Sequence, residues 1–198
     1  MRTRRKHPTD EKLLDAVLPV VAQSGVGDVT MDGLAAAAGV SKQTMYAHFG
    51  SKDALLERLL SREFEHLRAK VDDAAATFPA DDADPLRVIR GRIEPAYAYA
   101  FERPDGARLL LDPRAPDAGM RVHRLVADAV TRGLAEIGVD PDDRALADTV
   151  RVVLPMAAAA AIAGTQAALV GGIDQTRALD ATVAFVAAGV WSVLGAND

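Results

Sequence analysis

The chain has 198 residues, of which 49% are hydrophobic and 26% charged, and it contains no cysteine. This length suits one medium domain or two small ones, and the composition is typical of a soluble protein with a sizeable core. The lack of cysteine excludes disulfides, thiolate nucleophiles and cysteine-bound metals, and it fits a cytoplasmic protein. Ala, Val and Leu supply most of the apolar content and aromatic residues only 5%, which favours an all-α fold.

The net charge of −5 is unevenly distributed along the chain. Residues 1–70 carry 11 Lys and Arg against 9 Asp and Glu, a net charge of +2, whereas the remainder has a net charge of −7. A mildly basic end on an acidic body suits local contact with a polyanion. The cations in residues 2–6 form either a solvated arm or an additional contact with that polyanion.

Two segments raise the question of export or membrane insertion. The basic residues at the N-terminus precede no apolar run, so they do not read as a signal peptide. Residues 152–173 are uncharged over 22 positions, which is long enough to span a bilayer. That stretch is mostly Ala and Gly, and it lacks aromatic belts and basic flanks. We therefore expect a buried helix there and no membrane association.

The first third of the chain reads as four helices. Capping residues and glycines predict helices at about 9–24, 31–38, 42–49 and 51–77. Pro19, inside the first of them, predicts a lost hydrogen bond and a kink, for which we have no functional account. The expected N-caps are Thr9, Thr30, Ser41 and Ser51, and the expected ends of the first three helices are Gly25, Gly39 and Gly50.

Beyond a linker at 78–85, the sequence predicts five further helices and no internal repeat. They are expected at roughly 85–103, 105–111, 117–137, 142–171 and 174–195.

The short helix expected at 42–49 has two chemically different faces. At 100° per residue, Met45 and Phe49 share one face, which is expected to pack on the preceding helix. The opposite face holds Gln43, Thr44 and Ala47, with Tyr46 and His48 on its flanks. Amide, hydroxyl and small apolar groups facing outward between polar aromatic side chains are what a major groove requires.

The spacing around this helix is typical of a helix-turn-helix. Ala35 lets two helices cross closely, Gly39 permits a left-handed turn, and Val40 and Met45 bury the corner. Lys52, at the start of the next helix, stands where free backbone N–H groups and its own charge can hold a phosphate.

Residues 13–60 resemble the DNA-binding domain of TetR-type (tetracycline-repressor-like) transcriptional regulators. The motif is Ser-x-x-Thr-x-Tyr-x-His-Phe-x-x-Lys, together with Thr30 and the Ala35–Gly39–Val40 turn, and it covers about a quarter of the chain. Pro19 departs from the family pattern. The resemblance implies a helix-turn-helix DNA-binding domain at 1–52 and a helical regulatory and dimerisation domain at 53–198. The matching motif residues are Ser41, Thr44, Tyr46, His48, Phe49 and Lys52.

The resemblance also implies roles for individual residues. Thr30, Tyr46 and Lys52 are expected to hold phosphates, and His48 to contact the DNA backbone or support the helix. Two of these have simpler readings, in which Tyr46 caps the hydrophobic corner and His48 is a packed surface histidine. Lys42, Gln43 and Thr44 are expected to meet base edges or the nearby backbone, and with Ser41 they complete the expected DNA-binding set.

In the body, the resemblance implies an effector pocket and a homodimer formed by the last two helices. The small residues of 142–171 and 174–195 permit close packing, either between two subunits or within one subunit's core. The expected pocket residues fit a small-molecule site and a core equally well. They are Tyr97, Phe101, Met120, His123, Met156, Gln166 and Trp191.

Other classes of function fit less well. No phosphate loop, nucleophile elbow or His-Glu-x-x-His motif is present, and the four histidines are scattered, so we expect no enzyme, no metal and no cofactor. A helical interaction protein leaves Gln43, Thr44 and Tyr46 unexplained. We expect a homodimeric repressor that binds near-palindromic double-stranded operator DNA and is released by a small molecule. An activator of the same fold without release by a small molecule remains open, as do the effector, the operator and the target genes.

Overall fold

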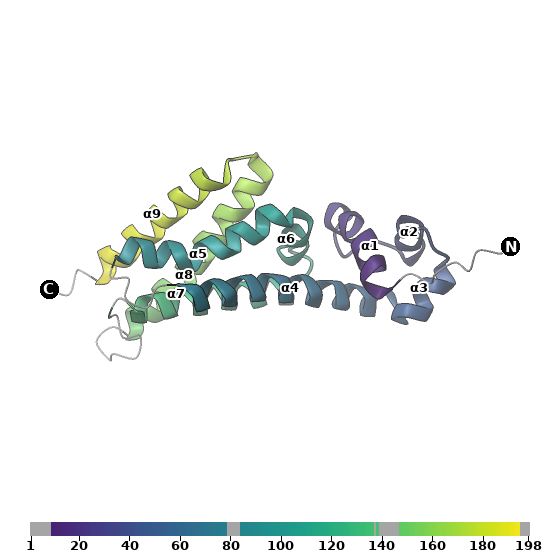
Figure 1. The fold of residues 1–198 in the computed structure, drawn as a ribbon, viewed down its shortest axis with the longest axis horizontal. Helices are drawn as coiled ribbons and strands as arrows, with labels where there is room; N and C mark the ends of the chain where they lie inside the picture. Colours follow the sequence, from purple (N-terminus) through teal and green to yellow (C-terminus); the bar gives the residue numbers. More distant parts are fainter. Residues whose placement is uncertain (1–8, 79–83, 137, 139–146, 195–198) are drawn as a thin grey trace.

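The computed structural model describes residues 9–78, 84–136, 138 and 147–194, and no strand occurs among them, so the all-α prediction is confirmed. Figure 1 shows a small N-terminal bundle and a larger body that share one long helix. The helices are α1 (Asp10–Ser24), α2 (Met31–Ala37), α3 (Lys42–Phe49), α4 (Lys52–Thr77), α5 (Pro85–Glu102), α6 (Pro104–Leu110), α7 (Pro116–Glu136), α8 (Ala147–Gly171) and α9 (Gln175–Leu194).

Three of the four predicted N-caps of the N-terminal bundle are confirmed. The side chains of Thr30, Ser41 and Ser51 each accept a hydrogen bond from a backbone N–H in the first turn of the following helix. Thr9 is wrong as a side-chain cap, because it has the extended backbone of an N-cap but makes no such bond. α1 continues through Pro19, whose side chain is exposed.

α4 contributes to two hydrophobic cores. Near its start, Leu55 and Leu59 pack in the core of the N-terminal bundle with residues of α1, α2 and α3. Further along, Leu67 and Val71 pack in the core of the body. The expected division between residues 1–52 and 53–198 therefore stays a prediction, since one continuous helix belongs to both cores.

α5 is the central helix of the body and packs against α4, α7 and α9. The predicted helices in this region are present, with ends shifted by about one residue. α6 and α7 begin at Pro104 and Pro116, one residue earlier than expected, because proline lacks only an N–H that is unpaired at a first helical position. Residues 142–146 of the predicted 142–171 helix lie outside the described residues.

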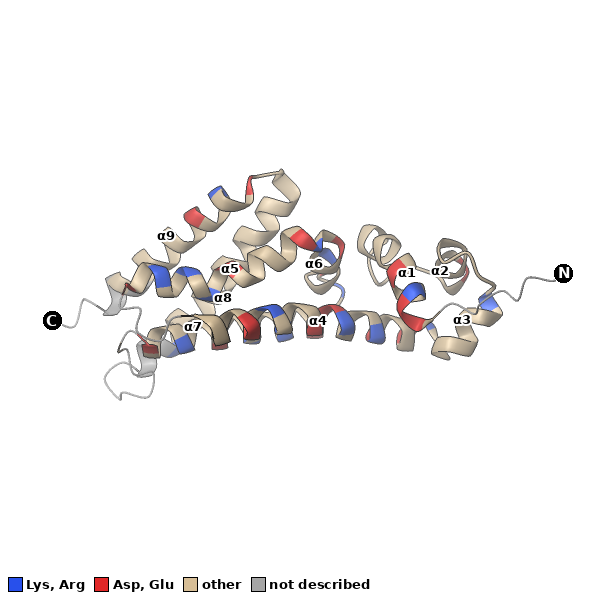
Figure 2. Cartoon of the chain, in the orientation of Figure 1, with Lys and Arg blue, Asp and Glu red and all other residues tan. Residues whose placement is uncertain are grey.

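The apolar helix α8 is buried on one face only. Arg151–Gly171 is long and apolar enough to cross a membrane, and only 28% of its apolar 18-residue stretch is buried inside the subunit. Ala157, Ala158 and Ala161 face the body core, whereas Val152 and Met156 are exposed. The expectation of a buried helix is correct for the inner face and wrong for the outer one within a single subunit. Figure 2 shows how few charges α8 carries compared with α4.

The loop between α6 and α7 makes hydrogen bonds to the N-terminal bundle. The Asp112 carboxylate accepts a hydrogen bond from the backbone N–H of Val26 at 3.0 Å, and the Arg114 guanidinium donates to the Ser24 carbonyl at 3.0 Å. Arg114 also pairs with Asp28 at 2.5 Å. Burial raises the pKa of the Asp112 carboxyl, but the N–H groups of Arg114 and Val26 and the Arg114 charge outweigh it, so that pKa lies below its usual value.

Candidate DNA interface and effector cavity

The turn between α2 and α3 has the geometry that the sequence predicts. Gly39 adopts a φ of 65°, in the left-handed region that favours glycine. The Val40 N–H donates to the Ala35 carbonyl at 3.0 Å, and the Gly39 N–H donates to the Ala36 carbonyl at 3.1 Å. These bonds close the end of α2 and set the direction in which α3 leaves the turn.

α3 is held by its inner face and presents a polar outer face. Met45 is fully buried and Phe49 nearly so, in the same core as Leu34 and Ala35 of α2. Gln43 is exposed, and Tyr46 is 44% exposed, which is unusual for so large an aromatic side chain. The prediction that Met45 and Phe49 are core residues is confirmed, and Gln43 and Tyr46 lie where a ligand outside the protein can reach them.

The first turn of α3 holds a group of mutually bonded polar side chains. Ser41 Oγ accepts from the Thr44 N–H at 3.1 Å and lies 2.8 Å from Thr44 Oγ1. Lys42 Nζ lies 2.8 Å from the Asp32 carboxylate of α2. The hydrogen bond to Asp32 and its negative charge raise the pKa of the Lys42 ammonium. Lys42 is therefore charged but partly engaged by an anion of its own chain.

The two expected phosphate-holding residues outside α3, Thr30 and Lys52, both have a hydrogen-bond partner near the start of α2. Lys52 Nζ, from the first position of α4, donates to the Val29 carbonyl at 3.2 Å. Val29 precedes Thr30, whose Oγ1 accepts from the Gly33 N–H at 3.2 Å. Residues that are distant in the sequence thus lie beside one another near the N-terminus of α2, which favours an anion.

His48 has a structural partner that sequence reasoning missed. Its Nδ1 lies 2.6 Å from Asp10 Oδ1, at the first residue of α1, and the other oxygen of Asp10 pairs with Arg58 of α4 at 2.9 Å. His48 therefore links α3 to α1 and α4. Among the described residues its Nε2 makes no hydrogen bond, so one nitrogen supports the fold while the other remains available.

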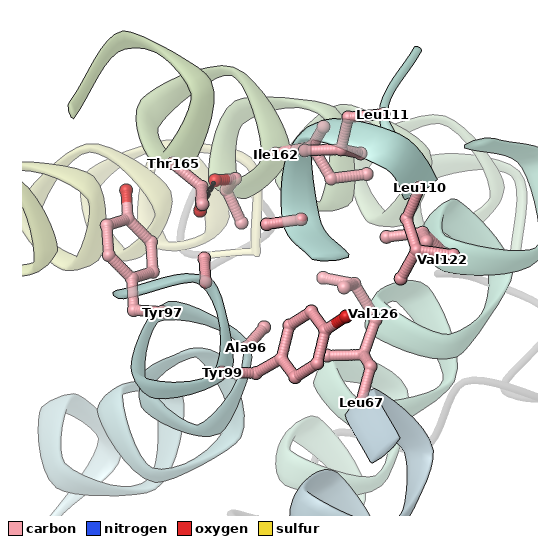
Figure 3. Close-up of a pocket in the computed structure, with 13 residues that line it drawn as sticks. Leu67, Ala96, Tyr97, Tyr99, Leu110, Leu111, Val122, Val126, Ile162 and Thr165 are labelled. Atoms are coloured by element: carbon pink, nitrogen blue, oxygen red, sulfur yellow. Dashed lines mark hydrogen bonds between the residues drawn. The ribbon is translucent and has the colours of Figure 1, made fainter. Parts of the chain in front are cut away.

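The body contains a small apolar cavity between α4, α5, α6, α7 and α8 (Figure 3). Its volume of about 30 Å³ holds a few water molecules at most, so it must widen to take an effector of ordinary size. Among the described residues that line it, the polar side-chain groups are the hydroxyls of Tyr97, Tyr99 and Thr165. The lining residues are Leu67, Ala96, Tyr97, Tyr99, Ala100, Ala107, Leu110, Leu111, Val122, Val126, Ala161, Ile162 and Thr165.

Of the seven residues expected to line a pocket, only Tyr97 lines this cavity. Phe101 is half-buried against the body core, and His123 places its Nε2 3.1 Å from the Pro155 carbonyl oxygen of α8. The other four side chains are exposed: Met120, Met156, Gln166 and Trp191. The structure thus does not bring the seven together, and their effector-binding role stays a prediction.

Sequence reasoning missed the polar group that lies behind the cavity wall. Glu63 is fully buried and accepts hydrogen bonds from Arg62, Arg103 and Tyr99. A signal was present, because Glu63 interrupts the apolar stripe of α4 midway between Leu59 and Leu67. Nothing in the sequence identifies Arg103 or Tyr99 as its partners, since they come from the end of α5.

At the sequence level, one family model and several bacterial regulators match part of the chain. Residues 13–59 match the family model "Bacterial regulatory proteins, tetR family". The transcriptional repressor KstR of Mycolicibacterium smegmatis is 42% identical over 74 residues, which cover 37% of this chain and 34% of that protein. KstR of Mycobacterium tuberculosis is 38% identical over 140 residues, 68% of this chain and 60% of that protein. The transcriptional activator FasR of Mycolicibacterium smegmatis is 31% identical over 114 residues, 56% of this chain and 50% of that protein.

The chain therefore spans between about a third and three fifths of the length of these relatives. Solved structures match over almost the whole chain. A TetR-like regulator from Rhodococcus sp. RHA1 superposes with a TM-score of 0.72 at 19% identity, covering 93% of this chain and 98% of that one. FadR from Bacillus subtilis, solved in complex with stearoyl-CoA, has a TM-score of 0.67 at 14% identity, with coverage of 91% and 99%. At such identities the match shows a shared fold.

Proposed function

This chain belongs to the TetR family of bacterial regulatory proteins, and from that premise we propose that it is a homodimeric, ligand-responsive repressor of transcription. Its DNA target is a near-palindromic operator, and a small molecule in the body releases it. Such a regulator works where the bacterial chromosome lies, in the cytoplasm.

The observation that carries this proposal is the outer face of α3. Gln43 and Tyr46 are exposed on a helix whose opposite side is anchored by Met45 and Phe49. Gln43 is suited to read a base edge, because an amide both donates and accepts hydrogen bonds. Tyr46 suits a phosphate, and Thr30 and Lys52 supply a second phosphate-binding position near the start of α2.

The outer faces of α8 and α9 support a homodimer. Val152, Met156 and Val170 of α8 and Phe185 of α9 are each more than 60% exposed, which leaves large apolar side chains uncovered in one subunit. The small residues expected at a subunit interface, such as Ala158, Ala161 and Val183, instead pack inside the monomer. The dimer surface we propose is therefore the exposed set, and a second copy covers it across a two-fold axis.

Selection of bound sequences from a random DNA pool tests the DNA-binding half of the proposal. Two recognition helices related by a two-fold axis should enrich a near-palindrome whose half-sites lie about one helical turn apart or a multiple of it. A reporter placed behind the enriched site separates a repressor from an activator. If no sequence is enriched at low salt, the chain is not an operator-binding regulator.

Sedimentation of the purified chain tests the dimer. The wild type should sediment as a dimer, and Phe185→Asp should shift it towards monomer, because a charge then faces the apolar surface of the partner. Ala69→Asp supplies a matched control, since Ala69 is also exposed and gains the same charge but lies on α4 and not on α8 or α9. A monomeric wild type would rule out the two-fold model.

A further inference from the structure

One hydroxyl in the cavity wall also belongs to a buried cluster of charges. Tyr99 is 3% exposed and lines the cavity, and Figure 3 places its ring in the wall near Val126. Its hydroxyl donates to Glu63 Oε2 at 3.2 Å. Burial, followed by the negative charge of Glu63, raises the pKa of Tyr99, so the hydroxyl keeps the proton that it donates.

Glu63 is held mainly by two arginines. Arg103 donates to its two oxygens at 3.0 and 2.9 Å, and Arg62 donates to Oε1 at 3.1 and 2.9 Å. Of the five hydrogen bonds that described residues donate to Glu63, the bond from Tyr99 is the longest and the only one from an uncharged donor, and it exceeds the usual O–H···O distance. It is therefore the bond in this cluster that yields first when the wall of the cavity moves.

Arg62 continues the cluster into the N-terminal bundle. Its Nη1 lies 2.8 Å from the Asp15 carboxylate and 3.4 Å from the Glu11 carbonyl, both on α1. Arg62 is itself only 9% exposed, so these contacts are partly shielded from solvent. An unbroken series of hydrogen bonds thus runs from Tyr99 through Glu63 and Arg62 to the first helix of the DNA-binding domain.

The wall of the cavity is unsuited to a charged ligand. No charged side chain occurs among the described residues that line it, and its other two hydroxyls are already engaged. Tyr97 bonds to Thr182 at 2.6 Å, and Thr165 donates to the Ala161 carbonyl at 2.8 Å. An ion placed there loses its hydration and gains no counter-charge from the wall. An apolar molecule has no such hydration free energy to lose.

We propose that this cavity takes an uncharged, largely apolar molecule, and that Tyr99 couples its presence to α1 through Glu63 and Arg62. The inference rests on the proposed function. It names the class of effector that the body binds and the residue that couples effector binding to the DNA-binding domain. The cavity must widen on binding, and the Tyr99 ring is one of its walls. Displacement of the Tyr99 ring removes one donor from Glu63. The side chains of Glu63 and Arg62 can then move, and α1, which Arg62 contacts, can shift relative to α4.

Three probes of equal chain length test the ligand class on the full chain: 1-decanol, decanoate and decylammonium, each below its aggregation concentration. The measurements are the melting temperature and the Kd for a duplex carrying the selected operator. The alcohol should raise the Tm and increase the Kd by about five-fold or more, the lower end of ordinary allosteric coupling. The two ions should do neither. Equal effects from an ion, or no Tm shift with the alcohol, would overturn the proposed ligand class.

Tyr99→Phe tests the transmitting residue, and Tyr97→Phe is its matched control. Both variants keep a ring in the cavity wall, but only the first loses a bond to Glu63. In Tyr99→Phe the alcohol should still raise the Tm, while the Kd for DNA should no longer respond to it. Tyr97→Phe should keep the wild-type response. A retained response in Tyr99→Phe, or an equal loss in both variants, would remove Tyr99 from the route.

The two levels of the proposal fail in different ways. If the wild type binds no selected duplex without a probe, the proposed function is wrong, and the Tm measurements alone still decide the ligand class. If DNA binding is intact and the probes or variants give the contrary pattern, only the cavity inference is wrong.

Discussion

The outer face of α3 and the wall of the body cavity are both candidate binding sites, but they are built in opposite ways. On α3, exposed Gln43 and Tyr46 stand apart from the buried Met45 and Phe49 that anchor the helix. In the cavity, Tyr97 and Tyr99 line the wall and also belong to the hydrophobic core of the body. Each is almost fully buried and hydrogen-bonded to another side chain. At the first site anchoring and recognition are assigned to different residues, and at the second the same residues do both.

This difference decides how each site responds to change. A substitution on the outer face of α3 should alter DNA binding and leave the fold intact, because the side chain has few neighbours. A substitution around the cavity should alter stability first, because each side chain there also holds helices together. The expected effects of substitution therefore decrease from the buried cluster outward to the surface.

The largest effect is expected for Glu63→Gln. An uncharged amide in place of the Glu63 carboxylate would leave Arg62 and Arg103 without their shared counter-charge, and breaking a buried ion pair typically costs about 3–5 kcal/mol. Urea denaturation followed by circular dichroism measures this loss as a fall in the free energy of unfolding. Glu65→Gln is the control, because Glu65 lies on the exposed side of α4 and should leave that free energy nearly unchanged. Equal effects of the two substitutions would mean that the buried cluster does not stabilise the body.

Acidification should weaken the same cluster in the wild type. Burial raises the pKa of the Glu63 carboxyl, but the bonds and charges of Arg103 and Arg62 outweigh it, so the pKa in the folded state lies below the unfolded value of about 4.3. The stabilisation is therefore complete above the unfolded pKa and is lost as pH falls through the folded pKa, at about 1.4 kcal/mol per unit of difference.

Urea midpoints measured at a series of pH values below about 6 check this prediction. The free energy of unfolding should fall with pH, and Glu63→Gln should flatten the slope. Asp112 supplies a remaining slope of the same sign, because its folded pKa is also depressed. A slope that Glu63→Gln leaves unaltered would show that the carboxylate does not titrate as this cluster requires.

On the DNA-binding face, Gln43→Ala should cost about 1–3 kcal/mol of binding to the selected operator and relax the preference at one base pair, as loss of a base contact does. Tyr46→Ala should weaken binding to all duplexes alike, since phosphate contacts carry no sequence information. Fluorescence anisotropy with selected and scrambled duplexes measures both. Should the two variants lose affinity equally on every duplex, Gln43 is not a base-reading residue.

The smallest effect is expected for Asp32→Ala. The Lys42–Asp32 pair is exposed on both sides, so its removal should barely change the Tm. It should instead strengthen DNA binding modestly and without regard to sequence, because it frees the Lys42 ammonium and removes an anion near the DNA. Weaker binding by Asp32→Ala would indicate that Asp32 positions Lys42 for contact.

The contrast between the two sites also explains why the DNA-binding face could be predicted from the sequence and the cavity could not. The helix-turn-helix was predictable because Gly39, the caps Thr30, Ser41 and Ser51, and the alternation of faces on α3 are local features. The sequence did not predict that Asp10 is the partner of His48, because these two residues are 38 positions apart. In the body, apolar residues that line a cavity have the same periodicity as those that fill a core, so only the folded arrangement separates Tyr99 from exposed Met120.

Whether α3 reads an operator sequence is decided by the affinities for the selected duplex and for a scrambled duplex of equal length, measured in parallel from low to high salt. Both affinities should fall steeply as salt rises, through loss of phosphate contacts. The selected duplex should stay the tighter ligand throughout, because α3 reads its bases. Equal affinities for the two duplexes, or no binding to either at low salt, would show that this chain does not recognise an operator.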